Sequence, residues 1–426
     1  MTQSLHRHRT KLALLLSLLG FNAVAVGEVE FLHWWTSNGE RKALSVLDEH
    51  LIHSSLSVST SSVLGGGGDS AMTVLQARAL AGNTPSFAQI EGPSIKSWDA
   101  IGILHNINAV AKQHQWDDVL YPLTIDINRT QNGYVALPLT LHRLNWLWVN
   151  HQLLNKLGLE APKTWPDMFD AMQKARQEGI MPLAIGKQPW QIAQLFESLV
   201  IASGGVDFYN TVLVDLNKNN IDSDQMRHAL KQFRRLSELL EVSEESVNST
   251  ELSNQKWDTA TAALANNEAL FQLGGDWILG ELLAENISVP SHIGCYPAPQ
   301  SHNIFLYNMD SFIFMKSKSF TQDDAIQLAN ALADKEFQTR FNQVKGSIPV
   351  RSDIDLSSFN PCQIQSYKDF NYAIEHGLAA PSMTDSMAVN PMAQQAINSE
   401  IFRYYRDSSV TEGEVIKRII SIAESN

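Results

Sequence analysis

Short apolar runs alternate with longer amphipathic segments along most of this chain, and this alternation restricts the possible folds more than any other feature. The strand-like runs, rich in β-branched and apolar residues, are 29–34, 56–63, 86–90 and 133–141. Between them, residues 40–51 and 71–80 place apolar side chains on one helical face. Strands that alternate with helices predict an α/β fold.

The length of 426 residues exceeds what one hydrophobic core usually organises, so we expect two lobes. No proline-, glycine- or serine-rich linker separates them, which predicts ordered chain crossings. Three further helices are predicted at residues 164–179, 259–271 and 321–343. Thr164 and Thr321 are their expected N-caps in the first and third cases.

The N-terminal segment predicts secretion. Arg7, Arg9 and Lys11 precede the apolar run 12–21, and Ala23-Val24-Ala25 fits a cleavage site, so residues 1–25 are typical of a signal peptide. No cysteine follows the run to carry a lipid. We therefore expect a periplasmic monomer without a lipid anchor, in peripheral and transient contact with the membrane only.

Charge and cysteine content limit the partners further. Removal of residues 1–25 takes the formal net charge from −13 to −16, which argues against nucleic acid as a partner because phosphate binding needs lysine and arginine. The two cysteines, Cys295 and Cys362, are compatible with one disulfide in an oxidising compartment or with two buried thiols.

Familiar catalytic and metal motifs are absent from the sequence. It contains no G-x-S-x-G, no H-E-x-x-H and no G-K-[ST] after a glycine loop. The glycine-rich stretch 64–70 lacks the lysine of a phosphate loop, and 215–224 lacks the glycine and the final acid of a calcium loop. We expect no cofactor and no metal.

Two adjacent tryptophans, Trp34 and Trp35, end the first predicted strand. Successive side chains of a strand face opposite sides, so both cannot join the same core face. Ligands of open α/β sheets bind outside the carboxyl ends of strands, and an indole ring suits the C–H face of a pyranose. A carbohydrate ligand is therefore indicated, with packing of both rings against neighbouring elements as the alternative.

Glu40 allows two interpretations. Ser37 and Glu40 have the spacing of a capping box, in which the glutamate bonds back to the cap residue. The carboxylate is equally able to accept hydrogen bonds from sugar hydroxyls. Spacing alone leaves both open.

Six motifs occur in order along the chain: HWWTSNGE, GGGGDSAMTVLQARALAGNTPSFAQIEGPSIKSW, TWPDMF, GGDW, NMDSF and KGSIPVR. Together they resemble the family 1 extracellular solute-binding proteins of ABC sugar importers, and the glucose-binding branch most of all. The resemblance covers essentially the whole mature chain. It implies a type II periplasmic-binding-protein fold, with lobe 1 formed by residues 28–137 and 302–357 and lobe 2 by residues 138–301 and 358–426.

The resemblance also implies ligand-binding positions. The matching positions are Trp35, Glu40, Gln89, Trp257, Trp277, Asp310 and Lys345. Trp34 and Thr36, on either side of Trp35, are also predicted to bind the ligand. For Trp257 the alternative is a core residue on a helix face, and Asp276 is expected to cap the following helix. Two positions depart from the pattern, because Glu91 and Asp385 stand where basic side chains are expected. Acceptors in place of donors predict a sugar other than glucose, such as an amino sugar or an oligosaccharide.

The expected function is capture of a mono- or oligosaccharide between two lobes and its delivery to an ABC transporter permease, without chemistry on the ligand. Two alternatives stay open. A secreted glycoside hydrolase would use paired carboxylates such as Glu40 and Asp310. A sugar-sensing partner of a chemoreceptor would bind its ligand in the same way.

Overall fold

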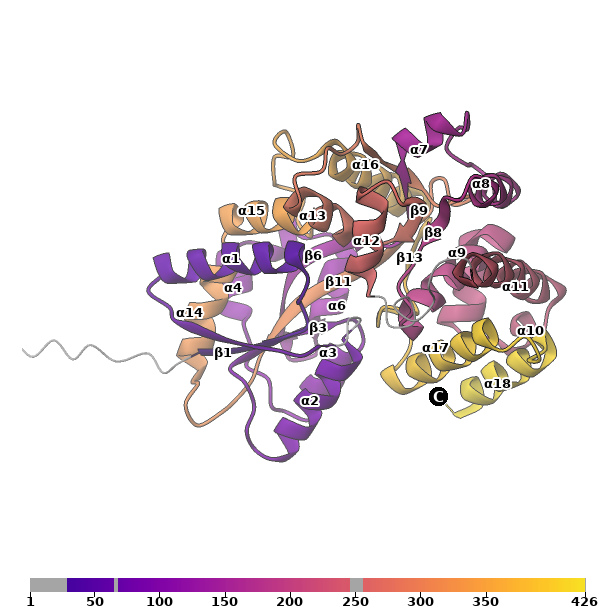
Figure 1. The fold of residues 1–426 in the computed structure, drawn as a ribbon. Coiled ribbons are helices and arrows are strands. Elements are labelled where there is room, and N and C mark those ends of the chain that lie inside the picture. Colours follow the sequence, from indigo (N-terminus) through magenta and orange to yellow (C-terminus); the bar gives the residue numbers. More distant parts are fainter. Residues whose placement is uncertain (1–28, 65–67, 246–255, 426) are drawn as a thin grey trace, which may run out of the picture.

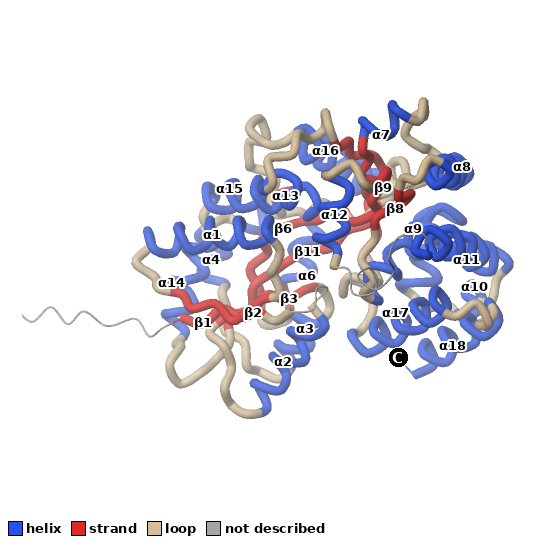
Figure 2. The backbone as a smooth tube through the Cα atoms, in the orientation of Figure 1, coloured by secondary structure: helices blue, strands red, loops and turns tan. Residues whose placement is uncertain are grey.

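The computed structural model of this protein describes residues 29–64, 68–245 and 256–425. These residues form two lobes, each with its own main sheet and surrounding helices (Figure 1). Figure 2 shows strands in the interior of each lobe and helices on the outside. The predicted signal peptide, residues 1–25, lies outside the described residues. Among the helices that the structure describes, none is both long and apolar enough to cross a bilayer.

Lobe 1 is built on a seven-stranded mixed sheet in the order β12-β6-β11-β3-β1-β2, with β13 paired to β11. Its strands are β1 (Val29–His33), β2 (Val58–Ser62), β3 (Phe87–Glu91), β6 (Ala136–Arg143), β11 (Phe305–Phe314), β12 (Ile348–Pro349) and β13 (Ala379–Pro381). β1 runs parallel to β2 and β3, and β11 runs antiparallel to β3 and β6. The predicted strand at the start of the mature chain is thus confirmed.

Helices and one short hairpin complete lobe 1. They are α1 (Asn38–His53), α2 (Asp69–Leu80), α3 (Ser94–Ala100), α4 (Asn108–Gln113), α5 (Trp116–Val119), α6 (Pro122–Asn128), α14 (Gln322–Leu332), α15 (Lys335–Lys345) and the strands β4 (Arg129–Thr130) and β5 (Gly133–Tyr134). The prediction of a single helix at 321–343 is wrong, because the structure has two helices there. The segment divides after Leu332 because the Asp334 side chain accepts a hydrogen bond from the backbone N–H of Phe337 and starts α15 as a new helix.

Lobe 2 is built on a four-stranded sheet in the order β10-β7-β9-β8. Its strands are β7 (Trp146–Asn150), β8 (Met181–Ala184), β9 (Ala269–Gly274) and β10 (Ile293–Pro297). Its helices are α7 (His151–Lys156), α8 (Trp165–Gln177), α9 (Pro189–Tyr209), η1 (Asn210–Val214), α10 (Lys218–Ile221), α11 (Asp224–Glu245), α12 (Trp257–Ala265), α13 (Trp277–Ala284), α17 (Pro391–Arg406) and α18 (Glu412–Ser425). Helix α16 (Pro361–His376) instead packs against β11, β12 and β13 of the lobe 1 sheet.

The helix predicted at 259–271 is only partly correct. α12 ends at Ala265, and Asn267 turns the chain with a positive φ of 61° so that β9 starts at Ala269. The apolar residues that follow belong to a fully buried strand, whose continuous apolar pattern resembles that of a buried helix.

Two chain crossings between the lobes run side by side and are joined by Asn145. Its Nδ2 donates to the Ile304 carbonyl at 2.8 Å, and its Oδ1 accepts from the Leu306 N–H at 3.1 Å. β6 continues in the lobe 1 sheet to Arg143, so the first crossing follows Arg143, while the expected boundary at 137/138 falls inside β6. The segment 358–426, expected in lobe 2, also contributes α16 and β13 to lobe 1, since α16 packs on the lobe 1 sheet and β13 pairs with β11.

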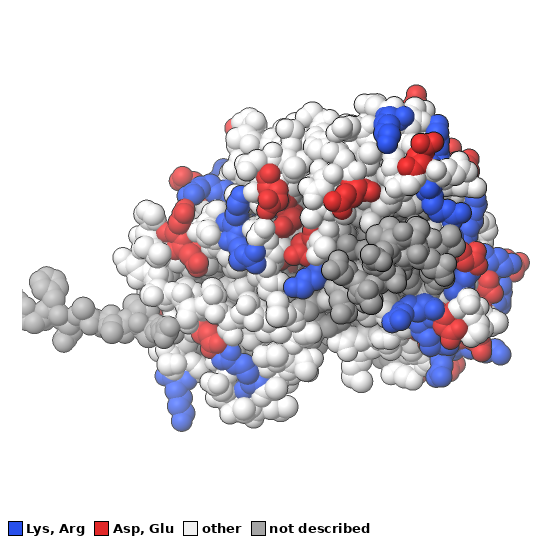
Figure 3. All heavy atoms as spheres, in the orientation of Figure 1, with Lys and Arg blue, Asp and Glu red and all other residues white. Residues whose placement is uncertain are grey.

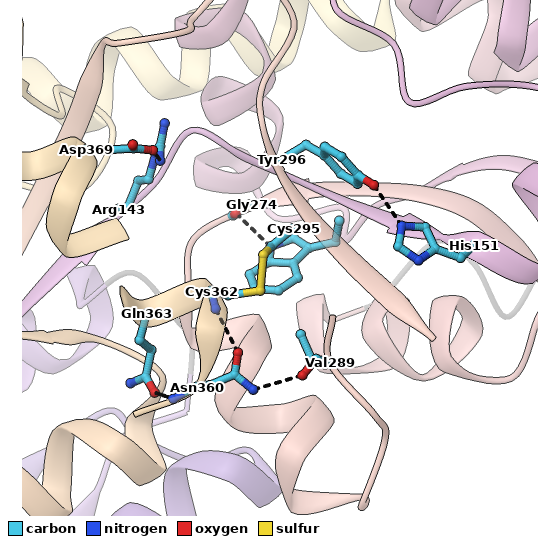
Figure 4. The surroundings of a disulfide bond; sticks show 11 residues. Arg143, His151, Gly274, Val289, Cys295, Tyr296, Asn360, Cys362, Gln363 and Asp369 are labelled. Carbon is cyan, nitrogen blue, oxygen red and sulfur yellow. Dashed lines mark hydrogen bonds and ion pairs between the residues drawn. A yellow bond between two sulfur atoms is a disulfide. The ribbon is translucent and has the colours of Figure 1, made fainter. Parts of the chain in front are cut away.

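A disulfide fastens α16 to the sheet of lobe 2. Cys295 of β10 and Cys362 of α16 are bonded, with their Cα atoms 6.1 Å apart and a sequence separation of 67 (Figure 4). Nearby, the buried Arg143 guanidinium pairs with Asp369 of α16 at 2.5 Å. α16 is thus attached both to the small sheet and to the end of β6.

Candidate ligand-binding cleft

A cleft between the two lobes holds about 700 Å³ of space outside the protein atoms, part of it open to solvent. The lining residues are Trp34, Trp35, Thr36, Ser37, Glu40, Leu64, Glu91, His142, Gln188, Trp190, Lys256, Trp257, Asp258, Trp277, Asn308, Asp310, Lys345 and Asp385. Of the eleven ligand-binding residues predicted from the sequence, ten line this cleft.

Gln89, the eleventh, lies beneath the cleft and is fully buried. Its Oε1 accepts from the Trp34 N–H at 3.2 Å, and its Nε2 donates to Asp310 Oδ1 at 2.8 Å. The amide therefore holds two neighbouring strands and a lining carboxylate in place.

The two tryptophans after β1 are both mostly buried. Trp35 is 2% exposed and packs against Phe31, Phe312 and Phe341, with ring centres 5.4–6.1 Å apart. Trp34 is 8% exposed. Both interpretations of this pair, core packing and cleft lining, therefore apply, and Trp35 exposes very little of its surface to a ligand.

Glu40 likewise forms the predicted capping box and also lines the cleft. The capping box is present, because its Oε2 accepts from the backbone N–H groups of Thr36 and Ser37 at 2.8 and 3.0 Å. Its Oε1 faces Lys345 Nζ at 3.5 Å, and this ammonium lies 5.6 Å from the centre of the Trp35 ring. Glu40 thus fixes the start of α1 while it lines the cleft.

A buried ionic network forms the floor of the cleft. His142, at the end of β6, has Nδ1 2.5 Å from Asp276 Oδ1 and Nε2 3.2 Å from Asp310 Oδ2. Burial lowers the pKa of His142, but the two carboxylates outweigh this and raise it to about 8. Burial raises the pKa of the Asp310 carboxyl, and the contacts with His142, Lys345 and Gln89 reverse this and lower it below its ordinary value.

Asp276 does not cap α13 through its side chain, contrary to expectation. Its carboxylate instead binds His142 and accepts from the Arg143 N–H at 3.0 Å. Helix α13 packs directly on α1 and α15 of lobe 1, which brings Asp276 next to His142 and Arg143 at the end of β6. A β-carbon at Gly280 would lie 2.6 Å from the Lys345 carbonyl oxygen, so only glycine permits this approach.

Three tryptophans of lobe 2 form the opposite wall. Trp277, at the start of α13, has its ring centre 6.0 Å from that of Trp190 and 6.5 Å from that of Trp257, in edge-to-face arrangements. Trp257 and Trp277 are half-buried and Trp190 is 8% exposed. Trp257 and Trp277 therefore present more ring surface to the cleft than Trp35 does.

Hydrogen bonds to Glu197 fix the segment just before Asp385, residues 382–384. Glu197 of α9, fully buried, accepts from Tyr209 Oη at 2.6 Å, from Ser382 Oγ at 2.9 Å and from the N–H groups of Met383 and Thr384 at 2.8 and 3.1 Å. Burial raises the pKa of the Glu197 carboxyl. Gln194 Nε2 then donates to Asp385 Oδ2 at 3.2 Å.

Several lining residues escape sequence reasoning. These are Ser37, Leu64, His142, Gln188, Trp190, Lys256, Asp258 and Asn308. Trp190 follows a proline at the start of α9, and Asn308 lies two residues before Asp310, on the same face of β11. Both features can be seen in the sequence, but they indicate a ligand site only once the neighbouring strands and helices are known. His142 in particular needs the pairing of β6 with β11.

Two α/β lobes, joined by paired crossings and lined between them by aromatic and charged side chains, define a two-lobe ligand-binding protein of the type II periplasmic-binding-protein fold. Residues 60–370 match the family of bacterial extracellular solute-binding proteins. The chain belongs to this family, whose description is that of a binding protein rather than an enzyme.

Relatives and solved structures agree with this assignment. The chain is 33% identical over 410 residues to a probable sugar-binding periplasmic protein of Rhizobium meliloti, covering 96% of this chain and 97% of the relative. A second probable sugar-binding periplasmic protein, from Mesorhizobium japonicum, is 32% identical over 94% of both chains. A chitin oligosaccharide binding protein shares the fold with a TM-score of 0.76 at 16% identity, covering 93% of this chain and 98% of that one.

Proposed function

We propose that this protein captures a mono- or oligosaccharide in the cleft between its lobes and delivers it intact to the permease of an ABC transporter. The observation that carries the proposal is the pairing of the Trp190–Trp257–Trp277 wall of lobe 2 with the charged floor of lobe 1. Aromatic faces suit the C–H side of a sugar ring, and charged acceptors suit its hydroxyl groups. The names of the relatives support the same ligand class.

Lobe closure supplies the mechanism in this proposal. A sugar that contacts both walls favours the closed arrangement in proportion to the contacts it gains there. The crossings at Asn145 are the natural hinge, since they are the short connections between the two sheets. A dissociation constant near micromolar corresponds to about −8 kcal/mol, which stacking and several charge-assisted hydrogen bonds can supply.

The cleft argues against the glycoside hydrolase alternative. A hydrolase needs one carboxyl group that stays protonated as a general acid, and such groups have raised pKa values. The pKa of Asp310 is lowered instead, and its oxygens accept from Gln89, Thr140 and His142. Glu40 is engaged by two backbone N–H groups and by Lys345. Neither carboxyl group is arranged to deliver a proton.

Cellular context completes the proposal. The segment 1–25 directs export to the periplasm, where the chain works as a monomer without a lipid anchor and touches the membrane only when it docks on the permease. Figure 3 shows Lys and Arg interspersed with Asp and Glu on the described part of this face, without a basic patch of the kind that nucleic acid requires. A sensory receptor as the docking partner stays the second possibility.

Incubation of the purified protein with mono- and oligosaccharides tests binding against turnover. We expect bound saccharide to be recovered unchanged, as judged by mass spectrometry, with no new reducing ends. Release of shorter saccharides would contradict the proposal. Co-purification from membranes then distinguishes a permease from a sensory receptor as the docking partner.

A further inference from the structure

Two consecutive residues of α13, Gly280 and Glu281, touch the parts of lobe 1 that carry an ion pair of the cleft. Helix α13 lies against α1 and α15 (Figure 1). Gly280 packs on the backbone of Lys345, whose carbonyl oxygen would lie 2.6 Å from a β-carbon at this glycine. Glu281 Oε2 accepts a hydrogen bond from the N–H of Gly39 at 2.7 Å. Glu40, the next residue, lines the cleft and faces Lys345, so lobe 2 contacts the backbone beside both members of this pair.

The Gly39 amide needs an acceptor from outside its own helix. It belongs to the first turn of α1, where backbone N–H groups have no partner within the helix. Ser37 serves two of its neighbours, because its Oγ accepts from the Glu40 N–H at 3.2 Å and its carbonyl accepts from the Arg41 N–H at 2.9 Å. The acceptor for Gly39 comes from lobe 2. Glu281 thus completes the start of a lobe 1 helix from the opposite lobe.

The contact between Glu281 and Gly39 is buried and tightly packed. Glu281 is 7% exposed, and a β-carbon at Gly39 would lie 2.7 Å from the Glu281 backbone nitrogen, so a larger residue would push the two helices apart. By contrast, the neighbouring hydrogen bond from Asn38 Nδ2 to Glu285 Oε1, 2.9 Å long, is exposed to solvent. A buried donor that loses its acceptor costs free energy, whereas an exposed donor turns to water. Of these two interlobe contacts, that of Glu281 therefore has the larger effect on the start of α1.

The surroundings of Glu281 require an acceptor and disfavour a charge. Burial raises the pKa of its carboxyl, and the nearby carboxylates of Asp258 and Glu40 add to this, while hydrogen bonds from Gly39 and Ser37 oppose it. An uncharged oxygen in the same place would still accept from the Gly39 N–H. Glutamine should therefore be able to replace this glutamate.

We propose that Glu281 is a positioning residue for ligand binding, which acts through Gly39 to hold Glu40 beside Lys345 in the wall of the cleft. Glu281 is not a lining residue, so it reaches the ligand only through these neighbours. Because coupling between two contacts is reciprocal, a sugar that binds Glu40 must strengthen the hydrogen bond between Gly39 and Glu281 to the same extent. This inference rests on the proposed sugar-binding function and adds to it a residue of lobe 2 that does not itself touch the sugar.

Hydrogen exchange of the Gly39 amide tests this coupling in the unaltered protein. The probe is whichever of glucose, galactose, xylose, N-acetylglucosamine and maltose binds the purified protein most tightly in calorimetric titration. We expect saturation with this sugar to slow exchange at Gly39 at least about fivefold, as measured by mass spectrometry of fragments from the start of α1. Exchange at Gly39 that is the same with and without the sugar would overturn the inference.

Three variants connect the effect to the acceptor oxygen. E281A removes the acceptor and should weaken binding of the same sugar about fivefold or more, while E281Q keeps an oxygen and should stay within about twofold of the wild type. E285A is the matched control, because Glu285 follows α13, is exposed and also contacts lobe 1, and its sugar affinity should not change. Equal affinity in E281A and wild type would contradict the inference, and so would an equal loss in E281Q.

Failure of the inference can be told apart from failure of the proposed function. If no sugar of the panel binds the wild type, the proposed function fails and the role of Glu281 fails with it. If a sugar binds but neither Gly39 exchange nor the affinity of E281A changes, only the role of Glu281 is refuted. Should E281A not fold, as judged by circular dichroism, the exchange experiment on the wild type decides alone.

Discussion

His142 Nδ1 lies 2.5 Å from Asp276 Oδ1, and this contact joins the end of strand β6 in lobe 1 to the residue just before α13. Both side chains are almost completely buried. With Asp310 on the other imidazole nitrogen, the histidine holds together the floor of the cleft. The carboxylates of Asp276 and Asp310 attract the His142 side chain strongly only while its imidazole is protonated. The stability of this network therefore depends on pH.

The first prediction concerns that pH dependence. The folded-state pKa of His142 is about 8, above its ordinary value of 6.5. Its contribution to stability should be fully present below pH 6.5 and lost as the pH rises through 8. We expect the difference in unfolding free energy between wild type and H142N to shrink by about 2 kcal/mol over this window. A difference that stays constant over this pH range would contradict it.

The second prediction concerns Glu197. Replacement by glutamine puts an amide N–H₂ among the donors of Tyr209, Ser382, Met383 and Thr384, so E197Q should lower the free energy of unfolding by about 1–3 kcal/mol. Amide hydrogen exchange at Met383 and Thr384 should accelerate, and Y209F should show a smaller effect. Unaltered exchange at these two amides would show that Glu197 does not order the segment that carries Asp385.

The third prediction separates the two tryptophan environments. Trp35 is packed against three phenylalanines and is 2% exposed, so W35A should lower the free energy of unfolding by about 3–5 kcal/mol. W277A should cost less because this ring is half-buried. Denaturant titration measures both values. Equal losses for the two variants would mean that the rings are equally part of the core.

The fourth prediction concerns the disulfide. It closes a segment of 67 residues, and loss of such a link relaxes the unfolded chain, so the C295S/C362S variant should lose about 2–4 kcal/mol of unfolding free energy. The single variants should resemble the double variant, since either one breaks the bond. Identical denaturation midpoints for wild type and double variant, measured without reductant, would contradict this expectation.

Sequence reasoning located most of the cleft because local signals and family resemblance fall on the same residues. The strand that ends just before Trp34 and Trp35, and the capping box of Glu40, are short-range patterns that the structure retains. The partners of those residues are long-range and were not readable. Lys345 faces Glu40 across 305 residues, and His142 acquires its role only when β6 and β11 pair.

The failures have equally specific causes. Asp276 has the residue type and position of a cap, but a buried imidazole competes for its carboxylate. The expected helix at 259–271 includes a buried strand whose apolar run has no distinguishing period. At Asp276 a tertiary contact outweighs a correct local preference, whereas at 259–271 the local pattern does not distinguish a buried strand from a helix.

Calorimetric titration of a saccharide panel into wild type and W277A tests the central claim most directly. The account predicts that at least one mono- or oligosaccharide binds the wild type with a dissociation constant near micromolar or tighter, and that W277A weakens this binding at least about tenfold. Absence of binding heat with every saccharide, or equal affinity in W277A, would contradict a carbohydrate site against this tryptophan wall.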